Sequence, residues 1–291
     1  MATILSLKRR IQAARNVSKT TRAMQMISAS KMKRAQSAAF AARPYAQRLE
    51  LLTKQITESL DQTTFSHPYL TPVNTEGRTL FMILGPDKGL CGSLITNLLR
   101  EFFRYQQGHK PHTVCLPVGK KIEGKVARAS EQVIASFPFG VNTPDIAMIY
   151  PFLQIINEQY LEGKVSSVKI LYTHFNSFFS QKPVLTTLLP MQLPEQMQTA
   201  EGKEKKQHYL FEPSAKELLP ALLKHTLETS LYHYLLESFL SEQASRMIAM
   251  QNATNNANDI ISDLLLEYNK TRQAKITSEL LDITGAGLAT T

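Results

Sequence analysis

The stretch whose residue types come closest to a binding site is GPDKGLCGS, residues 85–93. It follows an apolar run and precedes a segment of helix length, which is where phosphate groups bind in α/β folds. Its glycines, Gly85, Gly89 and Gly92, match neither the dinucleotide fingerprint nor the P-loop. A tight turn is therefore the favoured interpretation, and a phosphate site is the alternative.

The other reactive residue types are dispersed along the chain. His109 and His112 flank Pro111 in an expected loop, with no Cys or acid nearby to complete a metal site. Cys91 has no base beside it and is expected to be a buried thiol. Only Cys115 accompanies it, so no disulfide framework is expected and a reducing compartment is favoured. With no paired carboxylates or nucleophile set, the sequence predicts no catalytic residue, no metal site, no cofactor and no enzyme activity.

The positive charge is concentrated at one end of the chain. The residues up to Arg48 include 11 Lys and Arg, and the first acid is Glu50. The rest of the chain carries 22 basic and 24 acidic residues, so the net charge of +9 comes from this end. Such a positive field attracts a polyanion or an acidic protein surface. Residues 1–39 contain no aromatic side chain to stack on bases, which disfavours nucleic acid. A basic, acid-free start is also typical of an organelle transit peptide, which stays an alternative here.

Two long segments lack Gly and Pro and are predicted to be helices. They run over residues 2–43 and 221–284. The asparagine-rich stretch 251–260 contains no breaker, so we expect the second helix to run through it. Apolar and small residues recur at helical spacing, and we expect the two helices to pair as an antiparallel coiled coil. The expected seam residues are Ile4, Leu7, Ile11, Ala14, Ser18, Thr21, Met24, Ala29 and Met32 in the first, and Leu231, Leu235, Phe239, Met247, Met250, Ile260, Ile261, Leu264, Leu265 and Tyr268 in the second.

The middle of the chain alternates strand-like and helix-like segments. Strands are expected at 79–84, 113–118, 131–137, 168–175 and 183–190, and helices at 92–105, 120–129 and 145–161. This alternation predicts an α/β domain, Rossmann-like, with a mostly parallel sheet. The polar stretch 195–207 is expected to be a loop. The predicted division is an N-terminal shaft helix 1–60, an α/β domain 76–207, and a C-terminal helix 208–291 that pairs with the first.

Several motifs resemble those of the gamma subunits of F-type ATP synthases. They are KTTRAMQMISASKMKRAQ followed by ARPYA near the start, DKGLCG and YLFEP in the middle, and SEQASRMIAMQNATNNANDIISDLLLEYNKTRQAKITSELLDITGA near the end. The resemblance covers both ends almost completely and begins within the first residues, which disfavours the transit peptide and suggests a mature chain of bacterial type. Pro86 and Lys88 depart from the family pattern, where Ser and Arg are common.

The resemblance implies a non-catalytic rotor shaft. The terminal helices would form its coiled coil inside a ring of three alpha and three beta subunits, with the epsilon subunit and the membrane ring of c subunits at its foot. Ion flow would turn the shaft and drive the beta subunits through ATP synthesis or hydrolysis. The basic helix would face an acidic loop of beta. The expected location is peripheral, on the cytoplasmic side of the cell inner membrane, with no transmembrane segment and no nucleic acid. A basic coiled-coil protein that binds nucleic acid or scaffolds other proteins is the alternative.

The resemblance also assigns partner contacts residue by residue. Contacts with the alpha and beta subunits would come from Met24, Arg246, Arg272, Gln273, Thr277, Glu279 and Leu280. Phe211 and Glu212 would belong to the foot near the c ring. Lys88 is a further candidate contact, whose partner the altered loop leaves undefined.

Overall fold

A computed structural model describes residues 3–59, 67–72, 74, 77–109, 112–191, 212 and 214–288 of the chain. The chain divides into two compact units, each with most of its contacts inside itself. One combines Met1–Ala29 with Arg246–Thr291, and the other is Ser30–Ser245. The sequence-based boundaries at 60, 76, 207 and 208 fall on residues outside the described ranges, as does the expected loop 195–207, so that division stays a prediction.

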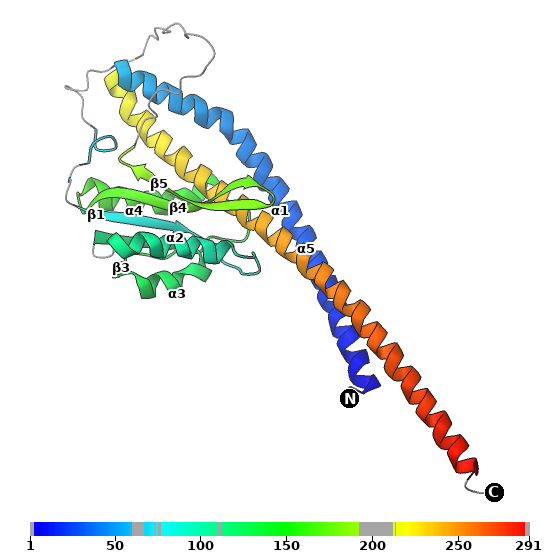
Figure 1. Cartoon of the computed structure of the whole chain (residues 1–291). Coiled ribbons are helices and arrows are strands. Elements are labelled where there is room, and N and C mark those ends of the chain that lie inside the picture. The colour runs from blue at the N-terminus through cyan, green and yellow to red at the C-terminus, as the bar shows by residue number, and fades with distance from the viewer. Residues whose placement is uncertain are drawn as a thin grey trace. The chain divides into compact units, whose positions relative to one another are not determined.

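Two helices are much longer than a typical globular helix. Helix α1 spans Ile4–Ser59 and helix α5 spans Ala215–Leu288 (Figure 1). Both run past the proline at which the sequence suggested a boundary, because Pro44 lies inside α1 and Pro220 inside α5. An interior proline costs about 3 kcal/mol. Burial of Ala39, Leu49 and Ile56 on both sides of Pro44 offsets that cost. The asparagine-rich stretch 251–260 is helical throughout, as predicted.

The unit Ser30–Ser245 contains a five-stranded sheet. Its strands are β1 Arg78–Leu84, β2 Thr113–Val118, β3 Gln132–Val133, β4 Val165–Ser177 and β5 Ser180–Leu189. Their order is β3-β2-β1-β4-β5, and every neighbouring pair is parallel except β4 with β5. The mostly parallel α/β sheet is therefore confirmed. The expected strand at 131–137 is too long, since only two of its residues form β3 and Phe137 adds a single bridge to Val118.

Three α-helices connect the parallel strands. They are α2 Leu94–His109, α3 Lys120–Ala129 and α4 Tyr150–Leu161, with a 3-10 turn η2 at Ile146–Ile149 before α4. Right-handed crossovers put α2 and α3 on one face of the sheet, and put α4, which leads back to β4, on the other. Covering of both faces explains why β1 is an unbroken apolar run, with Leu80–Leu84 all fully buried.

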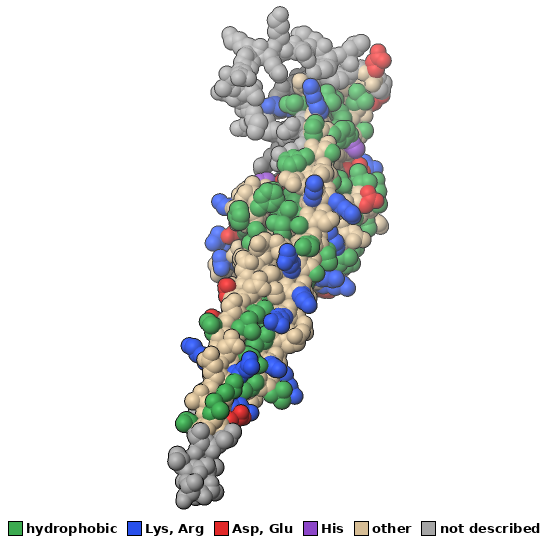
Figure 2. Space-filling model, turned by 90° about the vertical axis from the view of Figure 1, so that its right-hand side faces the viewer, with side chains coloured by type: hydrophobic (Ala, Val, Ile, Leu, Met, Phe, Trp, Pro, Cys, Tyr) green, Lys and Arg blue, Asp and Glu red, His purple; other side chains and the backbone are tan. Residues whose placement is uncertain are grey.

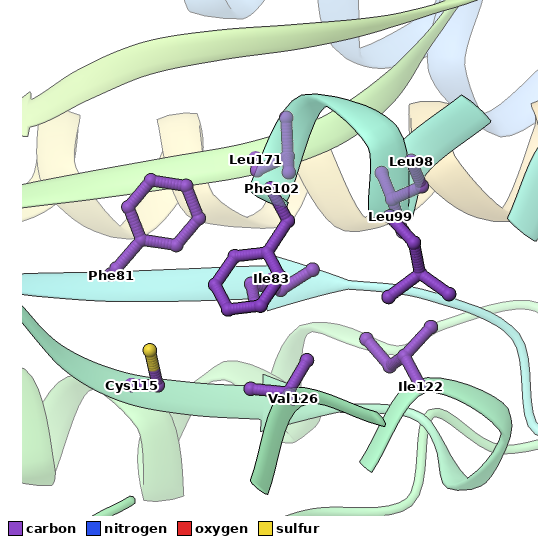
Figure 3. Close-up of a cluster of buried hydrophobic side chains, with 9 residues drawn as sticks. All are labelled: Phe81, Ile83, Leu98, Leu99, Phe102, Cys115, Ile122, Val126 and Leu171. Carbon is purple, nitrogen blue, oxygen red and sulfur yellow. The ribbon is translucent and has the colours of Figure 1, made fainter. Parts of the chain in front are cut away.

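The core between the sheet and the helices α2 and α3 is mostly apolar. Its polar groups are the Cys115 thiol and the buried Gln106 side chain, whose amide donates to the Cys115 sulfur at 3.5 Å. Figure 3 shows its side chains, which come from β1, β2 and β4 and from the two helices. Its members are Phe81, Ile83, Leu98, Leu99, Phe102, Cys115, Ile122, Val126 and Leu171. Full burial of each large side chain contributes about 1.5 to 3 kcal/mol, so this cluster contributes substantially to the unit's stability.

Pro117 lies in β2, between two neighbouring strands, where proline is normally excluded. Its carbonyl accepts a hydrogen bond from the Phe137 N–H at 3.1 Å, on the side of β3. Because the N and the C=O of a strand residue point to the same side, the missing N–H also faces that side. There the regular strand has already ended, so no ladder bond between long strands is lost.

Candidate functional site

The paired segments of α1 and α5 form the first candidate surface. Polar side chains hydrogen-bond across the pair: Ser18 to Asn258 at 2.8 Å, Thr21 with Thr254 at 2.7 Å, and Gln25 to Gln251. As the residue number rises on one helix it falls on the other, so the pair is antiparallel, as predicted. Leu7 and Ile11 pack against Leu264 toward the start of α1, with Leu265 and Tyr268 beside them.

The buried positions follow an alternating four-three spacing that differs in places from the expected seam. On α1 the seam passes through Gln25 and Ser28, so the expected Met24 and Ala29 flank it and are half-buried. On α5 Ala257 is buried, whereas Ile260 is 52% exposed. The assignment of Ile260 to the seam is therefore wrong. The strict spacing is that of a coiled coil, which keeps one face toward the partner helix.

The basic residues of α1 lie outside the seam. Six of them in this unit are exposed, and none forms a salt bridge within the described part of the chain: Lys8, Arg9, Arg10, Arg15, Lys19 and Arg22. Figure 2 shows Lys and Arg side chains spread along the helices with few acidic ones among them. Since no acid in the described ranges pairs with these six cations, their field is available to an acidic partner.

Helix α5 continues past the start of α1 (Figure 1). Its last described side chains are exposed, and the apolar ones among them are Ile276 (44% exposed), Leu280 (58%) and Leu281 (64%). A helix that exposes this much apolar surface next to charged residues is typical of a segment that another protein covers.

Most of the expected partner contacts on α5 lie in this exposed stretch. Arg272, Gln273, Thr277, Glu279 and Leu280 are all exposed. The Thr277 hydroxyl donates to the Gln273 carbonyl at 3.0 Å, and Glu279 lies 3.5 Å from Lys275 on the next turn. Both interactions stay within the helix and leave its outer surface accessible.

The remaining expected contacts are dispersed. Met24 is half-buried beside the seam, and Arg246 is 8% exposed, which leaves it little surface to offer a partner. Glu212 is exposed, and Phe211 lies outside the described residues. Lys88 is exposed in the loop after β1.

The loop after β1 is held by one carboxylate whose role the sequence analysis missed. Asp87 accepts three backbone hydrogen bonds, from the N–H of Lys120 (2.9 Å), Phe139 (3.0 Å) and Gly140 (2.9 Å). Burial raises the pKa of Asp87, but these hydrogen bonds and the Lys120 charge outweigh burial and lower it. The carboxylate thereby ties the loop after β1 to the N-terminus of α3. The alternative of a phosphate site concerned the N-terminus of α2 and stays a prediction.

Two glycines allow the loops to meet at this edge of the sheet. Gly119 has φ +122°, and a Cβ there would lie 2.0 Å from the Gly85 carbonyl oxygen. Only glycine fits such a close approach. The pairing of Gly85 with Gly119, each directly after a predicted parallel strand, was the signal that could have identified Asp87 as the group between the loops.

The reactive residue types are more structured than the sequence suggested. His109 is the last residue of α2 and stacks on Tyr105, so its assignment to a loop is wrong. His174 and His233 are half-buried against Glu237, a cluster that their dispersed positions in the sequence did not reveal. Cys91 and Cys115 are buried and form no disulfide. Within the described ranges, no group of three or more His, Cys, Asp and Glu side chains is arranged to hold a metal ion.

None of the helices described in the structure combines the length and the apolar character needed to cross a bilayer.

Known proteins share this sequence pattern and architecture. A family model described as ATP synthase matches residues 3–289. The ATP synthase gamma chain of Dehalococcoides mccartyi strain CBDB1 is 38% identical over 291 residues, and that of Roseiflexus castenholzii strain DSM 13941 is 36% identical over 293 residues. In both cases the match covers 99% of this chain and 99% of the relative.

Solved structures agree with these relatives. The central stalk and c ring of Tetrahymena thermophila mitochondrial ATP synthase include a chain that is 25% identical, with a TM-score of 0.59, over 80% of this chain and 99% of that one. A Euglena gracilis mitochondrial ATP synthase structure contains a chain with the same fold, at a TM-score of 0.65 and 18% identity, over 98% of this chain and 94% of that one. The antiparallel pair of terminal helices, the parallel α/β domain and these full-length relationships together show that the chain belongs to the family of ATP synthase gamma chains.

Proposed function

We propose that this chain is the central rotor shaft of an F-type ATP synthase. It couples ion flow through a membrane ring of c subunits to the conformational cycle of the catalytic beta subunits, in synthesis or hydrolysis of ATP. The chain itself is a non-catalytic subunit of that complex. Its partners in this proposal are three alpha and three beta subunits, an epsilon subunit and the c ring. The complex is membrane-associated, and we place the chain on the cytoplasmic side of the cell inner membrane.

The observation that carries the proposal is the antiparallel helix pair with its uncompensated cations. The six exposed cations of α1 have no acidic partner in the described chain, so an anionic surface of a beta subunit would supply the missing countercharge. Attraction between exposed charges acts over about 8 to 10 Å and is weak for any one pair. Such a field centres the shaft without holding it at one rotational angle. No observation favours the alternative of a nucleic-acid-binding or scaffold protein.

The assignment of individual contacts rests on exposure and chemistry. Arg272 presents a rigid fork of donors that suits a carboxylate or a backbone carbonyl of a beta subunit. Gln273 is its exposed neighbour, and Leu280 offers an apolar surface further along α5. Met24 flanks the seam, where a flexible and polarizable side chain can repack against changing neighbours. We propose Glu212, with Phe211, as part of the foot near the c ring.

Arg272→Ala tests the shaft function. We expect ion-gradient-driven ATP synthesis in membrane vesicles to fall about tenfold, because hydrogen bonds to a charged group contribute about 1.5 to 3 kcal/mol. The complex should still copurify with its alpha and beta subunits, since Arg272 is exposed and lies outside the buried face of the helix pair. Arg128→Ala is the matched control, an exposed arginine on α3. Synthesis at the rate of the control would remove Arg272 from the coupling contacts.

Met24→Lys tests the electrostatic part of the proposal, with Met24→Leu as its control. An added cation beside the seam should bind the acidic surface too tightly at one angle and slow rotation. Single-molecule rotation of the assembled complex should show longer pauses for the lysine variant than for the leucine variant. Equal pauses would contradict a loose electrostatic bearing at Met24.

A further inference from the structure

An open groove runs along the outer face of α2, in the unit Ser30–Ser245. Its volume is about 640 Å³, and α3 contributes to its lining. Figure 1 shows α2 and α3 as neighbours below the sheet. The residues that α2 contributes follow one another at steps of one, three and four positions. They are Thr96, Leu99, Arg100, Phe103, Arg104 and Gln107, and α3 adds Lys125.

The groove follows one stripe of α2 for about three turns. From Thr96 to Gln107 the helix rises about 16 Å, since each residue adds about 1.5 Å. Residues four positions apart lie above one another on a helix, so the stripe contains two parallel rows. Leu99 and Phe103 form an apolar row, and the two arginines between and beyond them form a cationic row. One face of α2 thus offers apolar and positive contacts side by side.

The apolar row extends from the core to the surface. Leu99 is 4% exposed and belongs to the buried cluster, whereas Phe103 is 42% exposed. The Phe103 ring packs beside the buried Phe102, with ring centroids 5.5 Å apart, so its position is fixed by a neighbour. An aromatic side chain that is anchored in this way and still open to solvent is typical of a binding hot spot.

The basic residues around the groove outnumber the acids. Helices α2 and α3 together carry six Lys and Arg side chains, against Glu101 and Glu123. Arg104 lies 2.9 Å from Glu101 in an exposed salt bridge, which stabilises little. Arg100 and Lys125 form no salt bridge within the part of the chain that the structure describes. Because like charges at i and i+4 destabilise a helix, an anionic ligand would relieve the repulsion between Arg100 and Arg104.

The shape and chemistry of the groove favour a helix as its occupant. A small phosphorylated ligand usually lies in a pocket that buries most of its surface, whereas this groove is open along its length. A nucleic acid uses cations and several stacking aromatics, and Phe103 is the one aromatic side chain in the lining. An amphipathic helix uses both rows, because its apolar face docks in a groove through residues at i, i+3, i+4 and i+7.

We propose that the groove between α2 and α3 is a docking site for an acidic amphipathic helix of a partner protein. Apolar residues of that helix pack on Leu99 and Phe103. Its carboxylates pair with the cations that line the groove, Arg100, Arg104 and Lys125. The site lies in the α/β unit and not among the six cations of α1, so it goes beyond the contacts proposed for the rotor shaft. Its test does not depend on the rotor function.

Binding of a synthetic helix to the full-length chain tests the docking site. The probe is a stapled, fluorescent peptide of about fourteen residues, or about 21 Å, with leucines at three- and four-residue spacing and glutamates elsewhere. We expect saturable binding by fluorescence anisotropy at physiological salt, where attraction between distant exposed charges is screened. A stapled peptide of the same composition in scrambled order should bind at least tenfold more weakly. Absence of saturable binding, or equal binding of the two peptides, would overturn the proposal.

Variants of the chain show whether the peptide binds in the groove. Phe103→Ala should weaken binding about tenfold, the loss typical of a hot-spot aromatic. Arg100→Ala with Lys125→Ala should weaken it about fivefold, as expected for two exposed ion pairs. Arg15→Ala with Lys19→Ala removes two exposed cations from α1 and is the matched control, which should stay within about twofold of the wild type. Circular dichroism verifies that each variant is folded. An equal loss in the α1 pair and the groove pair would overturn the proposal.

Two further measurements address other occupants of the groove. A single-stranded oligonucleotide could displace the peptide and bind more weakly to Phe103→Ala, which would assign the groove to nucleic acid. Sedimentation of the chain alone could show a dimer that Phe103→Ala abolishes, which would assign the groove to a second copy. Either result would overturn the acidic helix as the occupant. We expect neither displacement by the oligonucleotide nor a dimer that depends on Phe103.

Discussion

Different interactions stabilise each of the two compact units. The sheet of the unit Ser30–Ser245 encloses an apolar core, in which Phe81, Ile83 and Phe102 are completely buried. The unit formed by the ends of the chain has a seam of hydroxyl, amide and small side chains, with Leu7, Ile11 and Leu264 as its main buried apolar group. Apolar burial contributes about 25 cal/mol per Å², whereas an exposed neutral hydrogen bond contributes little net free energy.

The contrast indicates that the two units obtain their stability from different sources. A core of large apolar side chains can sustain the α/β unit without help. A polar seam allows two helix axes to approach closely but leaves the pair marginal, because most helical stability in proteins comes from burying an apolar face. Partner subunits around the pair, as proposed here, would supply the missing burial. The helix pair is therefore suited to a shaft that works inside other proteins.

The largest expected effect is in the apolar core. Phe81→Ala should lower the free energy of unfolding by about 3 to 5 kcal/mol, because it leaves a cavity at the centre of the cluster. Urea unfolding of the full-length chain, followed by far-UV circular dichroism, measures the change. Phe103→Ala, a 42% exposed aromatic on α2, is the control and should cost far less. Equal losses would contradict the distinction between core and surface.

Leu264→Ala should have a smaller effect that stays within the helix pair. Leu264 is 6% exposed and packs on Leu7 and Ile11, so we expect a loss of about 2 kcal/mol, at the low end for a buried leucine. Hydrogen exchange should increase in residues 7–14 and 257–268 and stay unchanged in β1. Leu266→Ala, 61% exposed on the same helix, is the control. Faster exchange in the sheet would show that the two units are not energetically separate.

The sequence predicted the elements of each unit because their patterns are local. The apolar run 79–84 and the strand 113–118 match β1 and β2 closely, and the helix 120–129 coincides with α3. The breaker-free segments 2–43 and 221–284 stopped short of the true helices at Pro44 and Pro220, where packing outweighs the local preference of proline. Strand β3 was overestimated, since an apolar segment at a sheet edge does not reveal how much of it pairs.

The contacts between elements were harder to predict. Asp87 accepts hydrogen bonds from N–H groups that lie between 33 and 53 positions later in the sequence. Glu237 contacts His174, which lies 63 positions earlier. No spacing rule connects such residues. The exposed positions Arg272, Gln273 and Leu280 came from the family resemblance, and their roles still require a partner to be tested. Residue type favoured Met24 over Gln25 as the seam residue, yet Gln25 holds the seam position and Met24 flanks it.

Asp87→Asn sharpens the comparison, because it tests a polar contact in the unit whose core is mostly apolar. An asparagine can replace only one of the two carboxylate oxygens as an acceptor, and we expect a loss of about 1 to 2 kcal/mol. Since the pKa of Asp87 is lowered, the ionised carboxylate stabilises the fold above its unfolded pKa. This contribution should disappear as pH falls through the folded pKa. Thermal unfolding between pH 6 and pH 3 should therefore show a steeper decline for the wild type than for the variant. Parallel curves would contradict the role assigned to the three hydrogen bonds.

The smallest expected effect is in the polar seam. The hydroxyl of Thr21 lies 3.0 Å from the Val17 carbonyl, that of Thr254 lies 2.8 Å from the Met250 carbonyl, and the two hydroxyls are 2.7 Å apart. Two hydroxyl protons cannot serve all three contacts, so the bond between the helices competes with the bonds inside each helix.

Replacing both residues by valine keeps their shape, and removing both partners together is often neutral or stabilising. Thr21→Val with Thr254→Val should therefore change the free energy of unfolding by less than about 0.5 kcal/mol, measured by urea unfolding. Thr254→Val alone should cost more than the double variant, because it leaves the Thr21 hydroxyl without its partner across the seam. A large loss in the double variant would mean that the polar seam stabilises the pair after all, and the contrast between the two units would then be one of residue type only.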